Sequence, residues 1–251
     1  MRKLILLLAL TLVATAAFAQ QAPRPRPFEF ATDFQTVPVM ANTPGLGGTF
    51  QSYVSLYNPT ASAFSVTATL YDSSGTKHEA SIPLAAGELK AYTNFLDTVF
   101  QYTGGGAVTF RSPDSAGGQR NNRFIVNSEV RTSGTRYSTS VPVLDFAGSS
   151  SRSFSPGVTV DSNSRTNVGC FNQSDAPQAV AVTVLDSTGK TTVGTTTLVL
   201  PGNAWGQAPV NSVVSNGLVQ FDPTDNAVCY AVVVDNSTND GRFIAAAEYR
   251  P

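Results

Sequence analysis

The chain has 251 residues and a formal net charge of −1, and only 13% of its residues are charged. Such a small and balanced charge offers no basic surface for nucleic acid and no polybasic surface for anionic lipid. With one histidine and two cysteines, the chain cannot assemble the usual His and Cys ligands of a zinc site. Nucleic-acid partners and zinc chemistry are therefore not expected.

The N-terminus predicts export. A basic start, Met1 to Lys3, precedes an apolar run over residues 4–16, and Ala17 to Ala19 form a small-x-small cleavage signal. The run is shorter than the about 20 residues that span a bilayer. We predict a signal peptide over residues 1–19 and no membrane insertion after cleavage. The mature protein is then periplasmic, on the cell surface or extracellular; an uncleaved anchor is the alternative.

Residues 20–33 are predicted to be a Pro-rich linker. Pro23, Pro25 and Pro27 alternate with other residues, which favours an extended polyproline II spacer without a packed core.

The rest of the chain contains an internal repeat. Residues 53–75 align with residues 167–189 without a gap, and seven positions are identical. A repeat unit of about 100 residues is long enough to bury its own core. We therefore expect two duplicated modules, over residues 34–147 and 148–251.

The pattern of both copies predicts β-strands. Phe64, Val66, Ala68 and Leu70 alternate with polar residues, as in a strand buried on one face, and residues 180–184 do the same. Both runs end in an Asp-Ser-x-Gly hairpin turn. Helical turns are expected at 94–101 and 211–216. Further strands are expected at 49–57, 88–93, 106–111, 123–131 and 136–143, then at 165–171, 191–200, 205–210, 217–221, 227–235 and 242–248.

These elements predict an all-β fold of two tandem antiparallel β-sandwiches, because no helix is placed to cross between parallel strands. Cys170 and Cys229 fall at core positions of strands that a sandwich can bring together. In an exported chain they predict a disulfide, and two free buried thiols are the alternative.

No catalytic set is expected. His78, the single histidine, adjoins a turn and has no counterpart in the second copy, so a solvated side chain is the simpler interpretation. Glu129 lies within a predicted central strand, but nothing in the sequence pairs it with a second carboxylate, as a glycosidase requires. The three glycines at 104–106 lack the Lys of a phosphate loop and are expected to form a loop before the next strand.

Two binding sites remain as hypotheses. Asp235, Asn236, Asn239 and Asp240 offer oxygen ligands that suit a structural Ca²⁺, although a polar hairpin turn explains the same residues. Four aromatic residues could stack on a sugar or a peptide, although a Trp covering the junction between modules is equally consistent. They are Trp205, Tyr53, Tyr92 and Tyr102.

Several segments resemble an uncharacterised family of secreted bacterial proteins, especially acidobacterial ones, built from tandem β-sandwich units. The resemblance is carried by residues 37–39, 47–50, 56–59, 165–169, 171–172, 198–201, 233–236, 240 and 243–244. A fainter likeness, around residues 53–71 and 123–132, is to the sandwich of sensory rhodopsin transducers. Both resemblances imply a fold and no activity.

The sequence therefore favours a non-catalytic exported protein that acts in adhesion, scaffolding or a matrix, with a protein or glycan as its surface partner. A carbohydrate- or peptide-binding module that uses the four aromatic residues is the alternative. A hydrolase with a site around Glu129 or the Asp235 loop is a third hypothesis.

Overall fold

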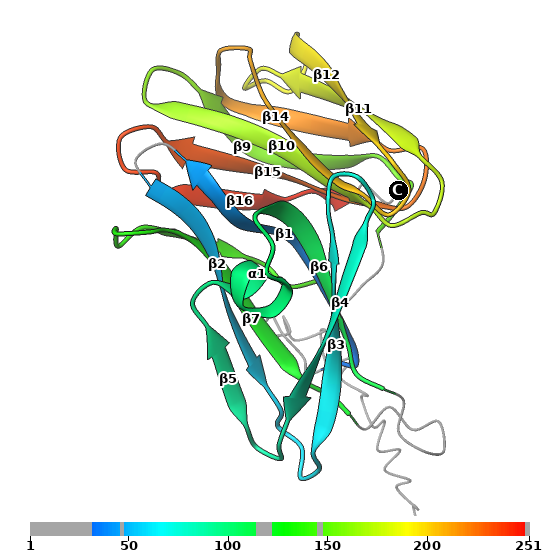
Figure 1. The fold of residues 1–251 in the computed structure, drawn as a ribbon. Helices are drawn as coiled ribbons and strands as arrows, with labels where there is room; N and C mark the ends of the chain where they lie inside the picture. The colour runs from blue at the N-terminus through cyan, green and yellow to red at the C-terminus, as the bar shows by residue number, and fades with distance from the viewer. Residues whose placement is uncertain (1–31, 46–47, 114–121, 145–147, 249–251) are drawn as a thin grey trace, which may run out of the picture.

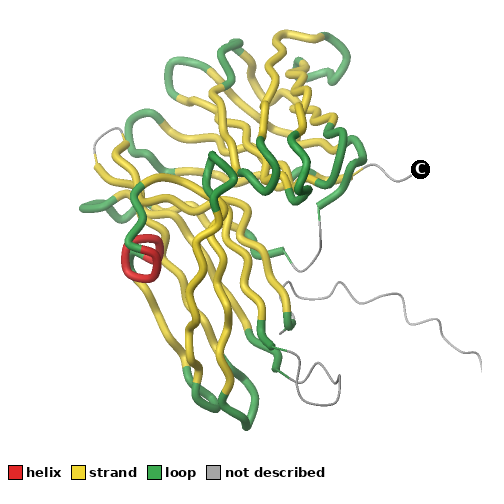
Figure 2. The backbone as a smooth tube through the Cα atoms, turned by 45° about the vertical axis from the view of Figure 1, so that its right-hand side comes forward, coloured by secondary structure: helices red, strands yellow, loops and turns green. Residues whose placement is uncertain are grey.

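The computed structural model describes residues 32–45, 48–113, 122–144 and 148–248. The predicted signal peptide and nearly all of the predicted linker lie outside these ranges. The described chain is almost entirely β, its sheets are antiparallel, and one short helix is present (Figures 1 and 2). The prediction of an all-β antiparallel fold is therefore confirmed.

The first unit is one eight-stranded sheet that bends over a single core. Its order is β4-β3-β6-β1-β2-β7-β8, and β5 pairs with residues 54–57 of β2, beyond the part that pairs with β1. Core residues from β3 and β6 join those from β2 and β7 in one hydrophobic cluster, so the two ends of the sheet face each other. The elements are β1 (Phe34–Gly45), β2 (Gly48–Tyr57), β3 (Phe64–Tyr71), β4 (Lys77–Leu84), β5 (Leu89–Tyr92), α1 (Phe95–Phe100), β6 (Gly104–Arg111), β7 (Ile125–Thr132) and β8 (Ser138–Val141).

The second unit consists of two sheets that enclose a second core. The four-stranded sheet has the order β13-β10-β15-β16, and the five-stranded sheet has the order β12-β11-β14-β9-β17. The strands are β9 (Ser153–Val160), β10 (Ser164–Asn172), β11 (Gln178–Leu185), β12 (Thr192–Leu200), β13 (Trp205–Pro209), β14 (Val214–Asp222), β15 (Ala227–Asp235), β16 (Gly241–Ala245) and β17 (Ala247–Glu248).

The two units share one topology. The order β4-β3-β6-β1 corresponds strand by strand to β12-β11-β14-β9, and β5-β2-β7-β8 corresponds to β13-β10-β15-β16. Because this order includes strands outside the aligned sequence segment, we infer that the second unit is a copy of the first.

The identical residues of the repeat have the same local roles in both units. The Asn58 amide donates to two loop carbonyls, and its carbonyl accepts the backbone N–H of Thr60. Asn172 likewise donates to two carbonyls and accepts the N–H of Ser174. Both Asn side chains are fully buried, so their polar groups require these partners. The repeat thus preserves residues that close a loop.

The main differences from the sequence expectation are three additional strands and one predicted helical turn that did not form. β1, β4 and β9 were not expected, and each contains Pro, which removes a ladder donor. In β1 the register shifts between Val37 and Met40, next to Pro38, so a bulge accommodates the missing N–H. Helix α1 forms as predicted, with Asn94 accepting the Asp97 N–H at its N-cap. The helical turn predicted at 211–216 was wrong, because residues from Val214 onward belong to β14.

Candidate functional site at the junction of the two units

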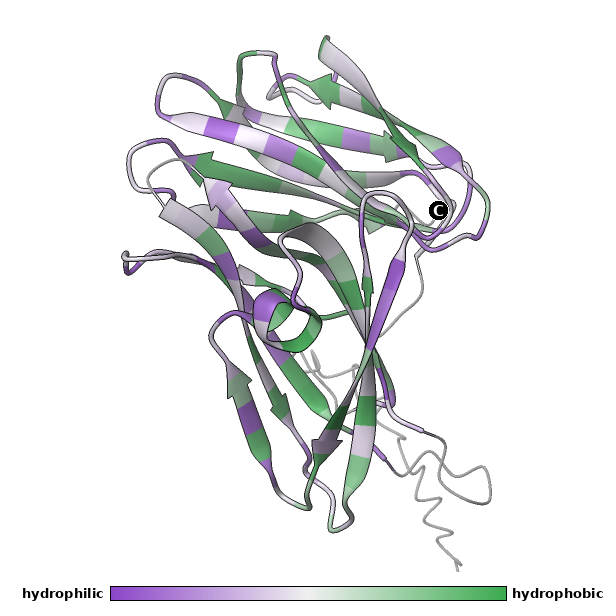
Figure 3. Cartoon of the chain, viewed as in Figure 1, coloured by the Kyte–Doolittle hydropathy of each residue, from purple (hydrophilic) through white to green (hydrophobic). Residues whose placement is uncertain are grey.

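The outer face of the four-stranded sheet packs against the first unit. Along β15, Cys229 and Ala231 belong to the second core, whereas Tyr230 belongs to the hydrophobic cluster of the first unit. Val232 and Phe243 also pack against that first cluster. Both faces of β15 are therefore covered, which is why the strand is apolar along most of its length instead of alternating (Figure 3).

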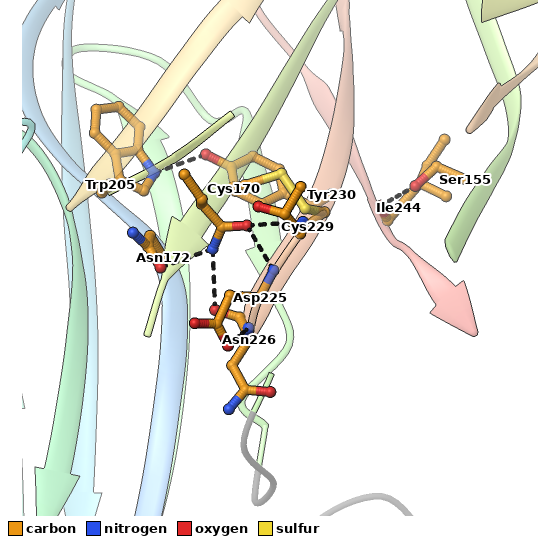
Figure 4. Close-up of a disulfide and its surroundings, with 11 residues drawn as sticks. Ser155, Cys170, Asn172, Trp205, Asp225, Asn226, Cys229, Tyr230 and Ile244 are labelled. Carbon is orange, nitrogen blue, oxygen red and sulfur yellow. Dashed lines mark hydrogen bonds between the residues drawn. A yellow bond between two sulfur atoms is a disulfide. The ribbon is translucent and has the colours of Figure 1, made fainter. Parts of the chain in front are cut away.

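Tyr230 is the centre of this junction. Its side chain is fully buried, and its hydroxyl accepts a hydrogen bond from Trp205 Nε1 at 2.9 Å (Figure 4). The hydroxyl donates in turn to Gln207 Oε1 at 3.1 Å. Burial raises the pKa of Tyr230 above its ordinary value, against the opposing effect of the Trp205 bond, so the phenol stays protonated. Gly169 lies directly opposite in the ladder, and a Cβ there would collide with the Tyr230 hydroxyl.

Further contacts join the units around Trp205. Its backbone N–H donates to the carbonyl of Asp72, which follows β3 in the first unit, at 3.1 Å. Its indole lies over Gly105, where an added Cβ would be 2.8 Å from the ring. Gly105 belongs to β6, so residues 104–106 form the start of a strand and not the loop expected from the sequence. Beside this contact the Tyr71 and Phe171 rings lie 4.8 Å apart.

A cavity of about 320 Å³ lies at the same junction. Its polar lining includes Asn167, Gln207 and Asn239. An apolar cavity with a few polar groups between two units is the usual setting of a small-ligand site. The apolar walls come from both units and include Met40, Phe50 and Val130 from the first and Trp205, Val232 and Phe243 from the second.

The four aromatic residues predicted to form a binding face are not brought together. Val54 and Tyr92 are opposite each other in the β2–β5 ladder, and both contribute to the first core. Tyr53, one residue from Val54, therefore projects from the other face of the sheet, where the Arg131 guanidinium lies 4.1 Å from its ring centroid. Tyr102 packs against the first core and contacts the His78 ring. Of these four aromatic residues, only Trp205 lines the junction cavity.

The predicted calcium ligands form the β15–β16 hairpin turn. Asp235 Oδ1 accepts the backbone N–H groups of Ser237 and Thr238 at 2.8 and 2.9 Å. Arg165, which was not among the predicted site residues, donates to Asn236 Oδ1 at 3.0 Å and to Asn239 Oδ1 at 2.9 Å. The two amide oxygens of the predicted ligand set thus accept hydrogen bonds from a guanidinium of the chain itself. Calcium binding stays a prediction, and it would require Arg165 to be displaced.

The candidate catalytic groups also have structural partners. His78 Nε2 lies 3.3 Å from Asp72 Oδ2, but the hydroxyl of Ser74 bonds Asp72 and not His78. That arrangement places the carboxylate between the other two groups, whereas a catalytic triad needs the imidazole between them. Glu129 on β7 forms an ion pair with Arg131. Among residues 32–248 that the structure describes, no three His, Cys, Asp or Glu side chains form a metal-binding group.

Two turn carboxylates should make stability depend on acid pH. A hydrogen bond from the Thr188 hydroxyl lowers the pKa of Asp186 to about 2, and one from the Ser237 hydroxyl lowers the pKa of Asp235 to about 2. Both values lie below the ordinary 3.8, so the unfolded chain binds protons first as the pH falls. The stabilisation is present above about pH 4 and is lost as the pH falls through about 2.

Urea midpoints measured between about pH 5 and pH 2 test this expectation. Thr188→Ala and Ser237→Ala should each flatten the dependence, whereas Ser187→Ala, at a neighbouring exposed hydroxyl, should not. An unchanged pH profile in both turn variants would contradict the assignment.

The predicted disulfide is present. Cys170 and Cys229 are bonded and lie directly opposite each other on β10 and β15, with their Cα atoms 4.1 Å apart (Figure 4). The bond joins two strands of one sheet, on the face that looks into the second core.

In the ranges that the structure describes, no helix is both long and apolar enough to span a membrane. The chain matches no known family model and gives no significant match to a curated protein. Among solved structures it is similar to Bacteroides uniformis beta-glucuronidase 2, covalently bound there to cyclophellitol-6-carboxylate aziridine. The identity is 10%, the TM-score is 0.17, and the match covers 88% of this chain and 27% of that chain. A TM-score of this size carries no argument about fold or function.

Proposed function

We propose that the protein is an exported, non-catalytic β-protein whose two units act together as one structural element in adhesion, scaffolding or a matrix. The observation that supports this most is the junction. Tyr230 and Trp205, two large aromatic residues of the second unit, contact each other and the first core. Side chains that a binding surface would present are thus used to hold the two units together.

The polar groups support the same proposal. Asp72, Asp186 and Asp235 each accept several hydrogen bonds from their own turns. Glu129 is neutralised by Arg131. Export is supported by the disulfide, since such bonds persist in oxidising compartments.

Cell fractionation combined with protease treatment of intact cells tests the location, and a panel of ester, glycoside and peptide substrates tests the chemistry. We expect the protein outside the cytoplasm and no turnover above that of a Glu129→Ala control. A cytoplasmic protein, or hydrolysis that Glu129→Ala abolishes, would overturn the proposal.

A carbohydrate- or peptide-binding role is the second candidate, and the junction cavity is the observation that favours it. Trp205 is the single Trp of the chain and lines the cavity, so its fluorescence reports directly on occupancy. Short sugars and peptides that bind there should shift the Trp205 emission.

Gln207→Ala removes one polar group of the lining and should weaken that binding about tenfold. Thr195→Ala, on the outer strand β12, should leave it unchanged. A panel that produces no shift, or a shift of equal strength in Gln207→Ala, would exclude the cavity as the site.

A further inference from the structure

Strand β12 is a long edge strand that carries neither the charged residues nor the Pro that often protect an edge. It ends the five-stranded sheet and pairs only with β11 among the described strands. Its nine residues are more than in any other edge strand of the described sheets, and none of them is charged or Pro. An edge of this kind presents unpaired N–H and C=O groups to another strand, and proteins commonly block it with Lys or Pro.

The first unit shows how the same edge is blocked. β4 occupies the equivalent edge of its sheet. Matched through the ladders of the two units, Lys77, Glu79 and Pro83 of β4 become Thr192, Thr195 and Val199 of β12. The two charges and the Pro are thus replaced by uncharged β-branched residues that favour pairing. The hydrophilic start of β4 and the paler, more apolar β12 are visible in Figure 3.

The exposed side chains of β12 strengthen the contrast. Val199 is 76% exposed, and Thr195 and Thr197 are exposed on the same face. One bulge, where the ladder skips Val193, limits the regular part of the strand to residues 194–200. A seven-residue regular edge is sufficient for a strand of ordinary length to pair with it.

We propose that β12 pairs antiparallel with β12 of a second copy of this chain, joining the two five-stranded sheets into one. β12 can pair with β12 of a second copy because no like charges come to lie opposite each other in such a pair. With the two-fold axis at Thr197, Val199 lies opposite Thr195 of the second copy, and both are β-branched. The contact is isologous and closes on two chains.

Charges beyond the ends of β12 fit the same arrangement. Lys190 precedes the strand, and in the two-fold pair it comes near residues 202–204 of the second copy. Asn203 in that segment holds the exposed carboxylate of Asp175 through a hydrogen bond of 2.6 Å. Each end of the paired strands would therefore bring a Lys toward an Asp of the other chain.

The first experiment measures the solution mass of the mature chain by light scattering or sedimentation over a concentration series up to about 100 μM. We expect two chains per particle at the upper end and dissociation on dilution. Val199→Lys should weaken this association about tenfold or more, since it places a charge at the edge. Val213→Lys is the matched control, because Val213 is 79% exposed but lies outside β12. A wild-type monomer throughout, or equal effects of the two Lys variants, would overturn the proposal.

The second experiment locates the contact. The two natural cysteines are bonded to each other, so Thr197→Cys introduces one free thiol next to the proposed axis. Mild oxidation should link two chains covalently in this variant. Ser81→Cys, at the equivalent position of β4, should remain mostly monomeric. If Thr197→Cys does not cross-link, or if Ser81→Cys cross-links equally, β12 is not the interface. Both experiments are independent of the location and role proposed above, so their failure would leave that proposal standing.

Discussion

Replacing Tyr230 by alanine is expected to lower the free energy of unfolding by about 3–5 kcal/mol, the range for removing a large buried aromatic side chain. Tyr230 is fully buried and fills space in the core of the other unit. Its loss would also leave the indole N–H of Trp205 without its acceptor. The variant should therefore weaken the junction more than either core.

Equilibrium urea unfolding, followed by far-UV circular dichroism and by Trp205 fluorescence, measures this effect. In the wild type the two signals should change together, as expected when the units unfold as one. In Tyr230→Ala the fluorescence should change at lower urea than the dichroism, because Trp205 reports on the junction.

Two further variants distinguish the contribution of the Tyr230 ring from that of its hydroxyl and from the effect of removing any tyrosine. Tyr230→Phe keeps the packing and removes the hydrogen bonds, so a smaller loss of about 1–3 kcal/mol is expected. Tyr137→Ala changes a tyrosine that is 42% exposed and should alter stability by less than about 0.5 kcal/mol. Equal midpoints for Tyr230→Ala and Tyr137→Ala would contradict the role assigned to the junction.

Removing the disulfide should have an effect of similar size. Cys170 and Cys229 are 59 residues apart in sequence, and the chain-entropy model gives about 4 kcal/mol for closing a loop of this length. The double variant Cys170→Ala, Cys229→Ala should therefore unfold at much lower urea than the wild type. Both positions are buried and apolar, so alanine introduces no unpaired polar group.

A reducing agent provides the control for this prediction. Reduction should shift the wild type toward the midpoint of the double variant and should leave the double variant unchanged. A loss below about 1 kcal/mol, or a double variant that still responds to the reductant, would show that the bond contributes little to stability.

Features governed by short-range rules were predicted well from the sequence. The alternation at 64–70 and at 180–184 corresponds to β3 and β11, because successive side chains of a strand point to opposite faces. Asp72 and Asp186 accept the backbone N–H two residues later in both hairpin turns, as a short polar side chain does locally. The disulfide was also predicted correctly, because each cysteine occupies a core position within a strand.

The candidate site could not be predicted in the same way. Trp205 could be assigned either to an exposed binding face or to the junction between modules, because the sequence shows which face of a strand is apolar but not what covers the other face. The structure places Trp205 at the junction and packs Tyr102 against the first core. The unbroken apolar run in β15 was the one available signal, since a strand with a solvated face would alternate. No sequence pattern indicates the contact of Arg165 with Asn236 and Asn239, because it joins residues more than 70 positions apart.

The β character of the chain, its repeat, its hairpin turns and its pair of bonded cysteines could all be predicted from the residues alone. These follow from backbone geometry and from side chains that act within a few residues or at matching strand positions. The folded chain was needed to see that the outer face of the β13-β10-β15-β16 sheet covers the core of the first unit. It also placed Trp205 against Tyr230 and left β12 at an edge. Such contacts depend on how whole sheets pack. The free energy of that packing is the sum of contacts between strands that are far apart in sequence, so no single segment of the chain predicts it.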